Sequence, residues 1–356
     1  MLEFFLAIPL FLLSVVITAG VLRMAIHAHF FAVPTDRSSH KNPTPVGGGV
    51  AIVFVYILGL WAVWSLNMVQ GLESLALGVG VVVAIIGLAD DKRHIDFRVR
   101  LLVQIAAVTG ALALVGPLPH ITMLGLNVEN ATLLFIFFSL TLLWMTNLYN
   151  FMDGIDGFAG LQACFVSLAA AGFLVSSHDY GLALLCIFVF AGAAGFLVWN
   201  WSPARIFMGD VGSGFLGFVL GLIAVISIAH GSMNLWSWVL LMGCFITDAT
   251  WTLLRRVLSG ERLYEAHCSH AFQIAAKRLD NHERVTIGLL LINALWLLPL
   301  AVLATKHPEY GVYFTAVGLL PLVGLALWIG AGKMSPGGFN FEVHNSTELE
   351  KKASRL

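Results

Sequence analysis

Long apolar runs alternate with short polar segments along most of the chain. A membrane-spanning helix needs about 20 apolar residues, and eleven runs approach that length. These runs cover residues 2–22, 46–65, 72–89, 101–116, 131–147, 158–176, 181–199, 214–230, 236–254, 285–305 and 311–332. The pattern therefore predicts an all-α polytopic membrane protein with about eleven transmembrane helices.

Basic residues are distributed unevenly among the polar segments. If successive runs cross the membrane in alternation, one face receives residues 23–45, 90–100, 147–157, 200–213, 255–284 and 333–356. Those segments hold 18 of the 19 Lys and Arg residues, and Lys306 is the one that falls on the other face. Lys and Arg are enriched in cytoplasmic loops. We therefore expect this face to be cytoplasmic, with the N-terminus outside and the C-terminus inside.

The composition also indicates a membrane protein. Hydrophobic residues make up 59% of the chain and charged residues only 11%, with a mean hydropathy of +0.89. A soluble domain carries about 25% charged residues. We expect one transmembrane domain over residues 1–332 and a cytoplasmic tail over 333–356. The net charge of −1 gives no sign of a nucleic-acid partner, and we expect none.

The aspartates gather on the same face as the basic residues. This face carries Asp36, Asp90, Asp91, Asp96, Asp153, Asp156 and Asp210 among others, whereas Asp179 falls on the outer face. Aspartate contributes little to membrane topology, and polar groups near a membrane usually face protein or a water-filled cavity. Carboxylates delivered by several separate loops therefore predict one active site formed by cytoplasmic loops.

The densest polar stretch is "NLYNFMDGIDGFAG", residues 147–160. On a helix, a step of three residues places Asn147, Asn150 and Asp153 within a wedge of about 120°. Glycines at 154 and 157 are expected to end the helix, so that Asp156 reaches the site from a loop. Carboxylate and amide oxygens are hard ligands that suit Mg²⁺.

Paired acids follow the third apolar run in "GLADDKRHIDFRVRLLVQ", residues 87–104. Adjacent Asp90 and Asp91 repel each other, so one should bind protons more tightly unless a cation compensates. Lys92, Arg93, Arg98 and Arg100 supply such cations. Acids among bases suit metal binding or removal of a proton from a phosphate.

A glycine-rich turn carries the last acid, in "NWSPARIFMGDVGSGFLG", residues 200–217. Asp210 lies between Gly209 and Gly212 at an expected helix start, where free backbone N–H groups favour anions. Such a carboxylate can hold Mg²⁺ beside a phosphate. Phe207 is placed to stack on a base.

Two basic loops complete the set. Residues 36–49 form a Pro- and Gly-rich loop that contains Lys41, and residues 255–278 contain Arg262, His267 and His270. These side chains suit an oxyanion or a sugar better than zinc. Asp248 precedes Arg255 and Arg256 by one or two helical turns, and we expect it to pair with them outside the site.

Five of these motifs together resemble the polyprenyl-phosphate N-acetylhexosamine-1-phosphate transferase superfamily, glycosyltransferase family 4. They are "RSSHKNPTPVGGG", "DD" with the later "RLLVQ", "NLYNFMDGIDGFAG", "PARIFMGDVGSGFLG" and the His-containing loop, in the family's order. With the apolar runs, the resemblance covers most of the chain. It implies an enzyme of the bacterial inner membrane that moves a sugar-1-phosphate from a UDP-sugar to undecaprenyl phosphate and releases UMP.

The resemblance implies roles for individual residues. Asp210 is similar to the principal Mg²⁺ ligand, with Asn150 as its partner and Mn²⁺ as a substitute metal. The catalytic carboxylates would be Asp90, Asp91, Asp153 and Asp156, of which Asp90 would deprotonate the lipid phosphate. Substrate contacts would come from Lys41, Asn147, Gly154, Asn200, Phe207, Arg262, His267 and His270, with Asp156 also near the uridine. The resemblance leaves a homodimer open.

The His-containing loop departs from the peptidoglycan-initiating relatives, which have three adjacent histidines. This chain has "HCSH" at residues 267–270. The sequence therefore favours the subgroup that starts O-antigen or similar surface glycans, with the phospho-N-acetylmuramoyl-pentapeptide transferase as an alternative. A polytopic secondary transporter is a second alternative. Transporters of this size usually show internal repeats with charges at the bilayer midplane, and neither feature is visible here.

Overall fold

The computed structural model describes residues 5–34, 40, 42–69, 71–123, 126–261 and 268–333. Within these ranges the chain is mostly helical, as the apolar runs predict. The helices and strands are α1 (Ala7–His27), β1 (Phe31–Ala32), β2 (Thr44–Pro45), α2 (Gly49–Ser65), α3 (Gly71–Gly78), α4 (Gly80–Arg93), α5 (Phe97–Val115), β3 (Ile121–Met123), β4 (Leu126–Val128), α6 (Ala131–Met152), α7 (Phe158–Ser176), α8 (Tyr180–Asn200), α9 (Asp210–Ala229), α10 (Leu235–Leu241), α11 (Gly243–Leu258), α12 (Ala271–Leu279), α13 (His282–Ile292), η2 (Asn293–Leu297), α14 (Leu298–Lys306), η3 (Pro308–Tyr310) and α15 (Gly311–Ile329).

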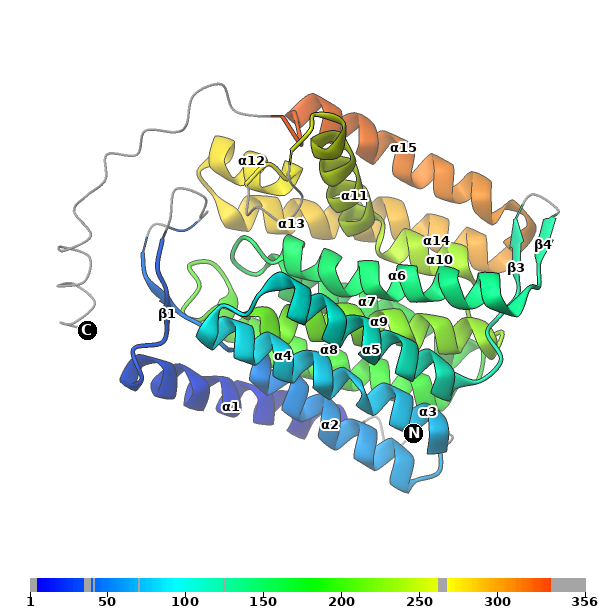
Figure 1. Ribbon diagram of the computed structural model, residues 1–356, viewed down its shortest axis with the longest axis horizontal. Helices are drawn as coiled ribbons and strands as arrows, with labels where there is room; N and C mark the ends of the chain where they lie inside the picture. The colour runs from blue at the N-terminus through cyan, green and yellow to red at the C-terminus, as the bar shows by residue number, and fades with distance from the viewer. Residues whose placement is uncertain are drawn as a thin grey trace.

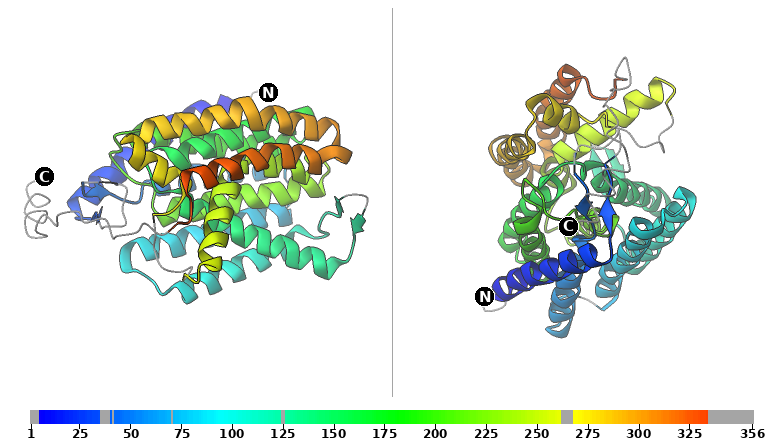
Figure 2. Two further views of the ribbon diagram at one scale, coloured as in Figure 1. Left: turned by 90° about the horizontal axis from the view of Figure 1, so that it is seen from above. Right: turned by 90° about the vertical axis from the view of Figure 1, so that its left-hand side faces the viewer.

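Most helices lie along the long axis of the molecule (Figure 1). Helices α1 and α2 form one side, and α13 to α15 form the other, with α6 to α9 between them (Figure 2). Within the described ranges, each of the eleven expected segments contains helix.

In the described part of the chain, nine continuous helical segments are long and apolar enough to cross a membrane. A tenth candidate is the pair α10 and α11, which is bent by 77°, and α2 is a shorter apolar helix. The chain is thus a multi-pass membrane protein. The number of spans and the side on which each end lies stay predictions.

Helix α9 forms the centre of the bundle. In its most apolar 18-residue window 89% of residues are buried, compared with 11% in α1 and in the segment that contains α15. Small residues allow neighbouring helices to approach α9 closely. A Cβ at Gly87 in α4 would lie 2.4 Å from the backbone oxygen of Asp210, and one at Gly49 in α2 would lie 2.4 Å from Cα of Gly212. The first turn of α9 is therefore locked between α2 and α4.

One end of the bundle collects the polar motifs. Helices α4, α6 and α8 end there, and α5, α9, α12 and α13 begin there. The short β1–β2 hairpin covers the same end, with Phe31 paired to Pro45. It is joined to the turn before α9 by a bridge between Val46 and Phe207. Residues far apart in the sequence are thus brought to a single place.

Candidate active site

A pocket of about 790 Å³ opens at this end of the bundle. It lies among the β1–β2 hairpin, the ends of α4 and α6, the start of α9, and the segment around α12 and α13. The sequence-predicted residues that line it are Asp90, Asp91, Asn150, Asp153, Gly154, Asp156, Asn200, Phe207 and Asp210. The convergence of separate loops on one site, expected from the sequence, is present in the structure.

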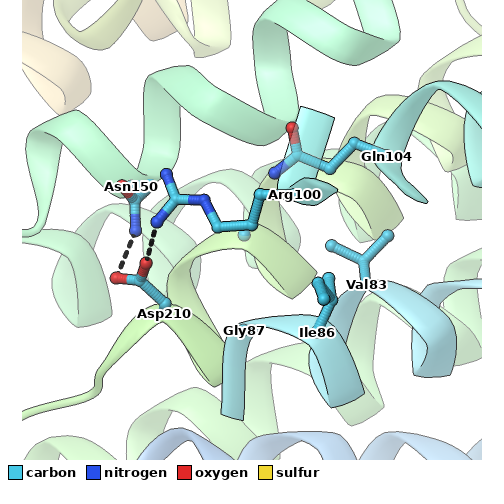
Figure 3. Close-up of a pocket in the computed structure, with 8 residues that line it drawn as sticks. Val83, Ile86, Gly87, Arg100, Gln104, Asn150 and Asp210 are labelled. Carbon is cyan, nitrogen blue, oxygen red and sulfur yellow. Dashed lines mark hydrogen bonds and ion pairs between the residues drawn. The ribbon is translucent and has the colours of Figure 1, made fainter. Parts of the chain in front are cut away.

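Asp210 lies at the polar centre of this site (Figure 3). Its Oδ1 accepts a hydrogen bond of 2.6 Å from Nδ2 of Asn150, and its Oδ2 accepts one of 2.7 Å from Nη1 of Arg100. Nδ2 of Asn150 also lies 3.1 Å from Oγ of Ser213. The Asp210–Asn150 pair inferred from the motifs is therefore a direct contact.

Arg100 is a residue of this cluster that sequence reasoning did not place in the site. The same Nη1 atom also contacts Oδ2 of Asp90, so one guanidinium nitrogen joins two carboxylates. Arg100 and Gln104 both line the small cavity drawn in Figure 3. Their four-residue spacing in "RLLVQ" puts them on one helix face, and this spacing was the available signal.

Asp91 holds the start of α9. Its Oδ1 accepts from the backbone N–H of Asp210 at 2.9 Å, and its Oδ2 accepts from that of Val211 at 3.2 Å. A carboxylate at a helix N-terminus satisfies otherwise unpaired N–H groups and interacts favourably with the helix dipole. Asp91 thus fixes the position from which the Asp210 side chain projects.

Asp153 terminates α6 and lines the pocket. Within the described ranges its carboxyl group has no hydrogen-bond partner. Burial, together with the negative charges of Asp210 and Asp91, raises the pKa of Asp153 to about 8. Asp153 is thus able to hold a proton near neutral pH.

Asp156 and Asn200 hold the loop that follows α6. Oδ2 of Asp156 accepts from Oγ of Ser202 at 3.1 Å and from the N–H of Ala204 at 3.2 Å, and it lies 3.3 Å from Nδ1 of His282. Although burial raises the pKa of Asp156, its hydrogen bond to His282 and that residue's charge help to lower it overall.

The backbone at Gly157 has a φ of 73°, and its N–H donates to Oδ1 of Asn200 at 3.0 Å. A positive φ favours glycine, and Gly157 directly precedes α7, so the expected break in the helix lies between Met152 and Phe158. Asn200 also donates from Nδ2 to the backbone oxygen of Ile206 at 2.9 Å. It therefore ties two pocket-lining loops together.

The remaining residues predicted to contact substrate do not all line the pocket. Phe207 lies in the pocket wall with its ring edge-on to His40, at a centroid distance of 4.9 Å. Asn147 lies one turn before Asn150 and donates from Nδ2 to Oε1 of Gln104 at 2.9 Å. His270 is only 2% exposed and is not among the residues that line the pocket. Lys41, Arg262 and His267 lie outside the described residues.

The oxygen donors near Asp210 fit a hard divalent cation that is shared with a phosphate. Across the described ranges, no group of three or more His, Cys, Asp or Glu side chains is arranged to hold a metal ion. Mg²⁺ is usually bound by only one or two carboxylates together with substrate phosphates and water. Asp210 and Asp90 supply such a partial set of oxygens, whereas Asn150 turns its amide nitrogen, not its oxygen, toward Asp210.

The chain matches known proteins over the same region. Residues 76–228 match the model of glycosyl transferase family 4. A probable undecaprenyl-phosphate N-acetylglucosaminyl 1-phosphate transferase of Bacillus subtilis is 30% identical over 267 residues, which are 72% of each chain. A decaprenyl-phosphate N-acetylglucosaminephosphotransferase of Mycobacterium leprae is 27% identical over 305 residues, 75% of each chain.

A peptidoglycan-type relative is also similar. The phospho-N-acetylmuramoyl-pentapeptide-transferase of Lactiplantibacillus plantarum is 29% identical over 242 residues, which are 63% of this chain and 73% of the relative. The matched family region includes the acids of α4, the end of α6 and the start of α9. The chain therefore belongs to glycosyl transferase family 4, the superfamily that its motifs resemble.

Proposed function

We propose that this protein transfers an N-acetylhexosamine-1-phosphate from a UDP-sugar to undecaprenyl phosphate and releases UMP. Family membership and the names of the relatives support hexosamine-1-phosphate transfer to a polyprenyl phosphate. The observation that carries the proposal is the cluster of Asp90, Asp210, Asn150 and Arg100 in one pocket at the end of the bundle. A membrane-embedded protein with this cluster is suited to a reaction between two anionic phosphates, one of them attached to a lipid.

Charge repulsion is the main obstacle to this reaction. The phosphate oxygen of the lipid attacks the β-phosphorus of the nucleotide, a new P–O bond forms, and the bond to the UMP oxygen breaks. Catalysis of phosphoryl transfer rests mostly on positioning and on stabilising charge. The Arg100 guanidinium lies beside the carboxylates and can neutralise negative charge that develops there.

Asp210 and Asp90 would hold a Mg²⁺ ion, or Mn²⁺ as a substitute, and Asn150 would join them as a ligand only through its amide oxygen. When bound, the ion supplies positive charge to the diphosphate and to the leaving UMP. Asp91 keeps the first turn of α9 in place, so the position of Asp210 is set before substrate arrives.

Asp153 is the carboxyl group best placed to hold a proton in this site. A neutral acid repels incoming phosphates less than an ionised one does, and it can donate a hydrogen bond. Asp90 lines the pocket and is held there by Arg100 and by the N–H of Ile95 at 2.7 Å. Direct attack by the lipid phosphate requires no covalent enzyme intermediate.

The uridine would be bound by Phe207 together with the loop that follows α6. Gly154 and Asp156 line the same pocket as Phe207, whose ring can stack on a pyrimidine. We further propose that the product starts a lipid-linked surface glycan such as O-antigen, at the cytoplasmic side of a bacterial inner membrane. The "HCSH" sequence in place of three adjacent histidines supports this subgroup.

The test is a release assay with purified protein, undecaprenyl phosphate, Mg²⁺ and a panel of UDP-sugars. The panel should include UDP-N-acetylglucosamine, UDP-N-acetylgalactosamine, their 6-deoxy relatives and the muramoyl-pentapeptide nucleotide. We expect UMP release with at least one N-acetylhexosamine donor, and none when the lipid phosphate is omitted. Turnover of the muramoyl-pentapeptide donor alone would assign the chain to peptidoglycan synthesis instead, and no UMP release from any donor would reject the proposal.

A further inference from the structure

Asp248 has a different set of partners from the one its sequence position suggests. The sequence places it near Arg255 and Arg256 on α11, but its carboxylate points to the start of α12. Oδ1 accepts from the N–H of Ala271 at 2.9 Å, and Oδ2 accepts from that of Phe272 at 3.0 Å. Oδ1 also lies 3.3 Å from Nδ1 of His270. Asp248 is therefore the cap of α12.

This cap is buried and well satisfied. Asp248 is 8% exposed, and Thr252 on the same helix donates to its Oδ1 at 3.0 Å. A buried carboxylate is tolerated when several donors satisfy it. The arrangement fixes α12 relative to α11 across a separation of more than twenty residues in the sequence.

Helix α12 in turn carries Gln273 into the pocket wall. Gln273 is 7% exposed and is the residue of this segment that lines the pocket. Its Oε1 accepts from the backbone N–H of His270 at 3.4 Å. Because an N–H can only donate, the amide oxygen must face His270, and this fixes Nε2 on the opposite side.

Nε2 of Gln273 faces the loop after α6. A Cβ built on Gly154 would lie 2.8 Å from this nitrogen and 3.1 Å from Cζ of Phe272. The ring of Phe272 stacks on Phe158 at the start of α7, with a centroid distance of 4.6 Å. Within the described residues Nε2 donates no hydrogen bond. Among the residues that the structure describes, this amide donor therefore has no acceptor, and it lies against the pocket wall beside Gly154.

We propose that Gln273 donates a hydrogen bond from Nε2 to a carbonyl oxygen of the bound sugar nucleotide, and that Asp248 is the positioning residue that holds Gln273 in place. The inference rests on the proposed function. An amide N–H is a neutral donor, which suits a carbonyl oxygen better than the diphosphate served by Arg100. Such a carbonyl belongs either to the uracil ring or to the N-acetyl group of the sugar.

The test measures the affinity of the purified, detergent-solubilised full chain for UMP, UDP-N-acetylglucosamine and UDP-glucose. Gln273→Glu keeps the oxygen that caps His270 but removes the donor, and Gln273→Met removes both while keeping a similar volume. We expect affinity to fall about three- to tenfold in both variants, which is the size of one neutral hydrogen bond. A loss shared by all three ligands assigns the bond to uracil, whereas a loss for UDP-N-acetylglucosamine alone assigns it to the acetyl group.

Asp248→Asn tests the positioning role, because an amide NH₂ would face a backbone N–H of α12. The affinity loss of Asp248→Asn should match that of Gln273→Glu. The double variant that combines both changes should bind no more weakly than the weaker-binding of the two single variants. Thr252→Val removes a hydrogen bond that Asp248 receives from its own helix and keeps the two bonds from the backbone of α12, so it should bind like the wild type. Additive losses in the double variant would show that Asp248 does not act through Gln273.

Two outcomes separate this inference from the proposed function. Unchanged affinities in both Gln273 variants, with the wild type binding normally, would overturn the inference alone. If the wild-type chain bound none of the three nucleotides, the proposed function would be rejected and the inference with it. Thermal unfolding of every variant checks that a loss of affinity is not a loss of fold.

Discussion

Nη1 of Arg100 lies 2.7 Å from Oδ2 of Asp210, and the same nitrogen contacts Oδ2 of Asp90. A single cationic group thus contacts one carboxylate from α4 and one from α9. These residues, Asp90 and Asp210, are 120 positions apart in the sequence. Two carboxylates held this close repel each other unless a cation lies between them. The contact explains how the site keeps several acids together in the absence of substrate.

Replacing Arg100 should therefore impair catalysis. We expect Arg100→Gln to lower kcat/KM by about a hundredfold or more, because a preorganised positive group at the reacting phosphates is lost. The control is Arg98→Gln, since Arg98 is exposed and its guanidinium lies over the ring of Phe97 rather than in the pocket. Equal activity of the two variants in the UMP-release assay would contradict a role for Arg100.

Asp210 should be required for metal-dependent turnover. We expect Asp210→Asn to lower kcat by about 10²- to 10⁴-fold, because the amide loses the charge that binds Mg²⁺. EDTA should abolish activity of the wild type, and added Mg²⁺ should restore it. Asp96→Asn is the matched control, because Asp96 caps α5 and asparagine caps helices equally well. Full wild-type activity in EDTA would remove the metal from the mechanism.

The close approach of α4 to α9 should be sensitive to one methyl group. A Cβ at Gly87 would lie 2.4 Å from the backbone oxygen of Asp210, so Gly87→Ala must push the two helices apart. We expect a loss of about 1–3 kcal/mol of stability, together with lower activity as Asp91 moves away from α9. Gly110→Ala is the control, because nothing lies within 4 Å of a Cβ at that position in α5. A melting temperature of Gly87→Ala equal to that of the control would refute the packing argument.

The sidedness of the pocket is a further prediction. In a variant without the four native cysteines, Arg98→Cys should react with a membrane-impermeant maleimide only in inverted vesicles. Lys306→Cys should react only in intact spheroplasts. The distribution of basic residues motivates both expectations, and both positions are exposed. Labelling of Arg98→Cys from outside would place the pocket on the wrong side for a cytoplasmic UDP-sugar.

The helices and most of the pocket acids were predictable because their signals are local. Apolar length identifies a membrane helix from a short stretch of sequence, and Asp90, Asp153 and Asp210 each stand beside a helix end. The positions of Arg100 and Asp248 depend instead on how helices cross. Arg100 looked like one of several cations in its segment, and Asp248 looked like a partner for arginines on its own helix. The 77° bend between α10 and α11 also has no clear sequence signal, and it brings Asp248 to α12.

The last prediction concerns an ionic cluster at the opposite end of α9. Nδ1 of His230 lies 2.8 Å from Oδ2 of Asp179, and its Nε2 lies 2.9 Å from Oε1 of Glu73. Ser232 donates to the same Asp179 oxygen at 2.9 Å. Ionised carboxylates only accept hydrogen bonds, so both ring nitrogens must carry protons for both contacts to form. The cluster ties the start of α3 and the start of α8 to the end of α9.

Because of these partners, the cluster should make stability depend on pH. Hydrogen bonds to Asp179 and to Glu73 raise the pKa of His230 from 6.5 to about 9, although burial opposes this shift. A group whose pKa is raised by folding binds protons more tightly in the folded state, so its contribution is complete below pH 6.5 and is lost as the pH rises through about 9. We expect the melting temperature of the wild type to fall across this window, whereas His230→Gln should start lower and change less. His307→Gln, at a histidine whose side chain is 54% exposed, serves as the control and should follow the wild type. If the wild type and His230→Gln lost stability in parallel between pH 6.5 and 9, the titration would belong to another group.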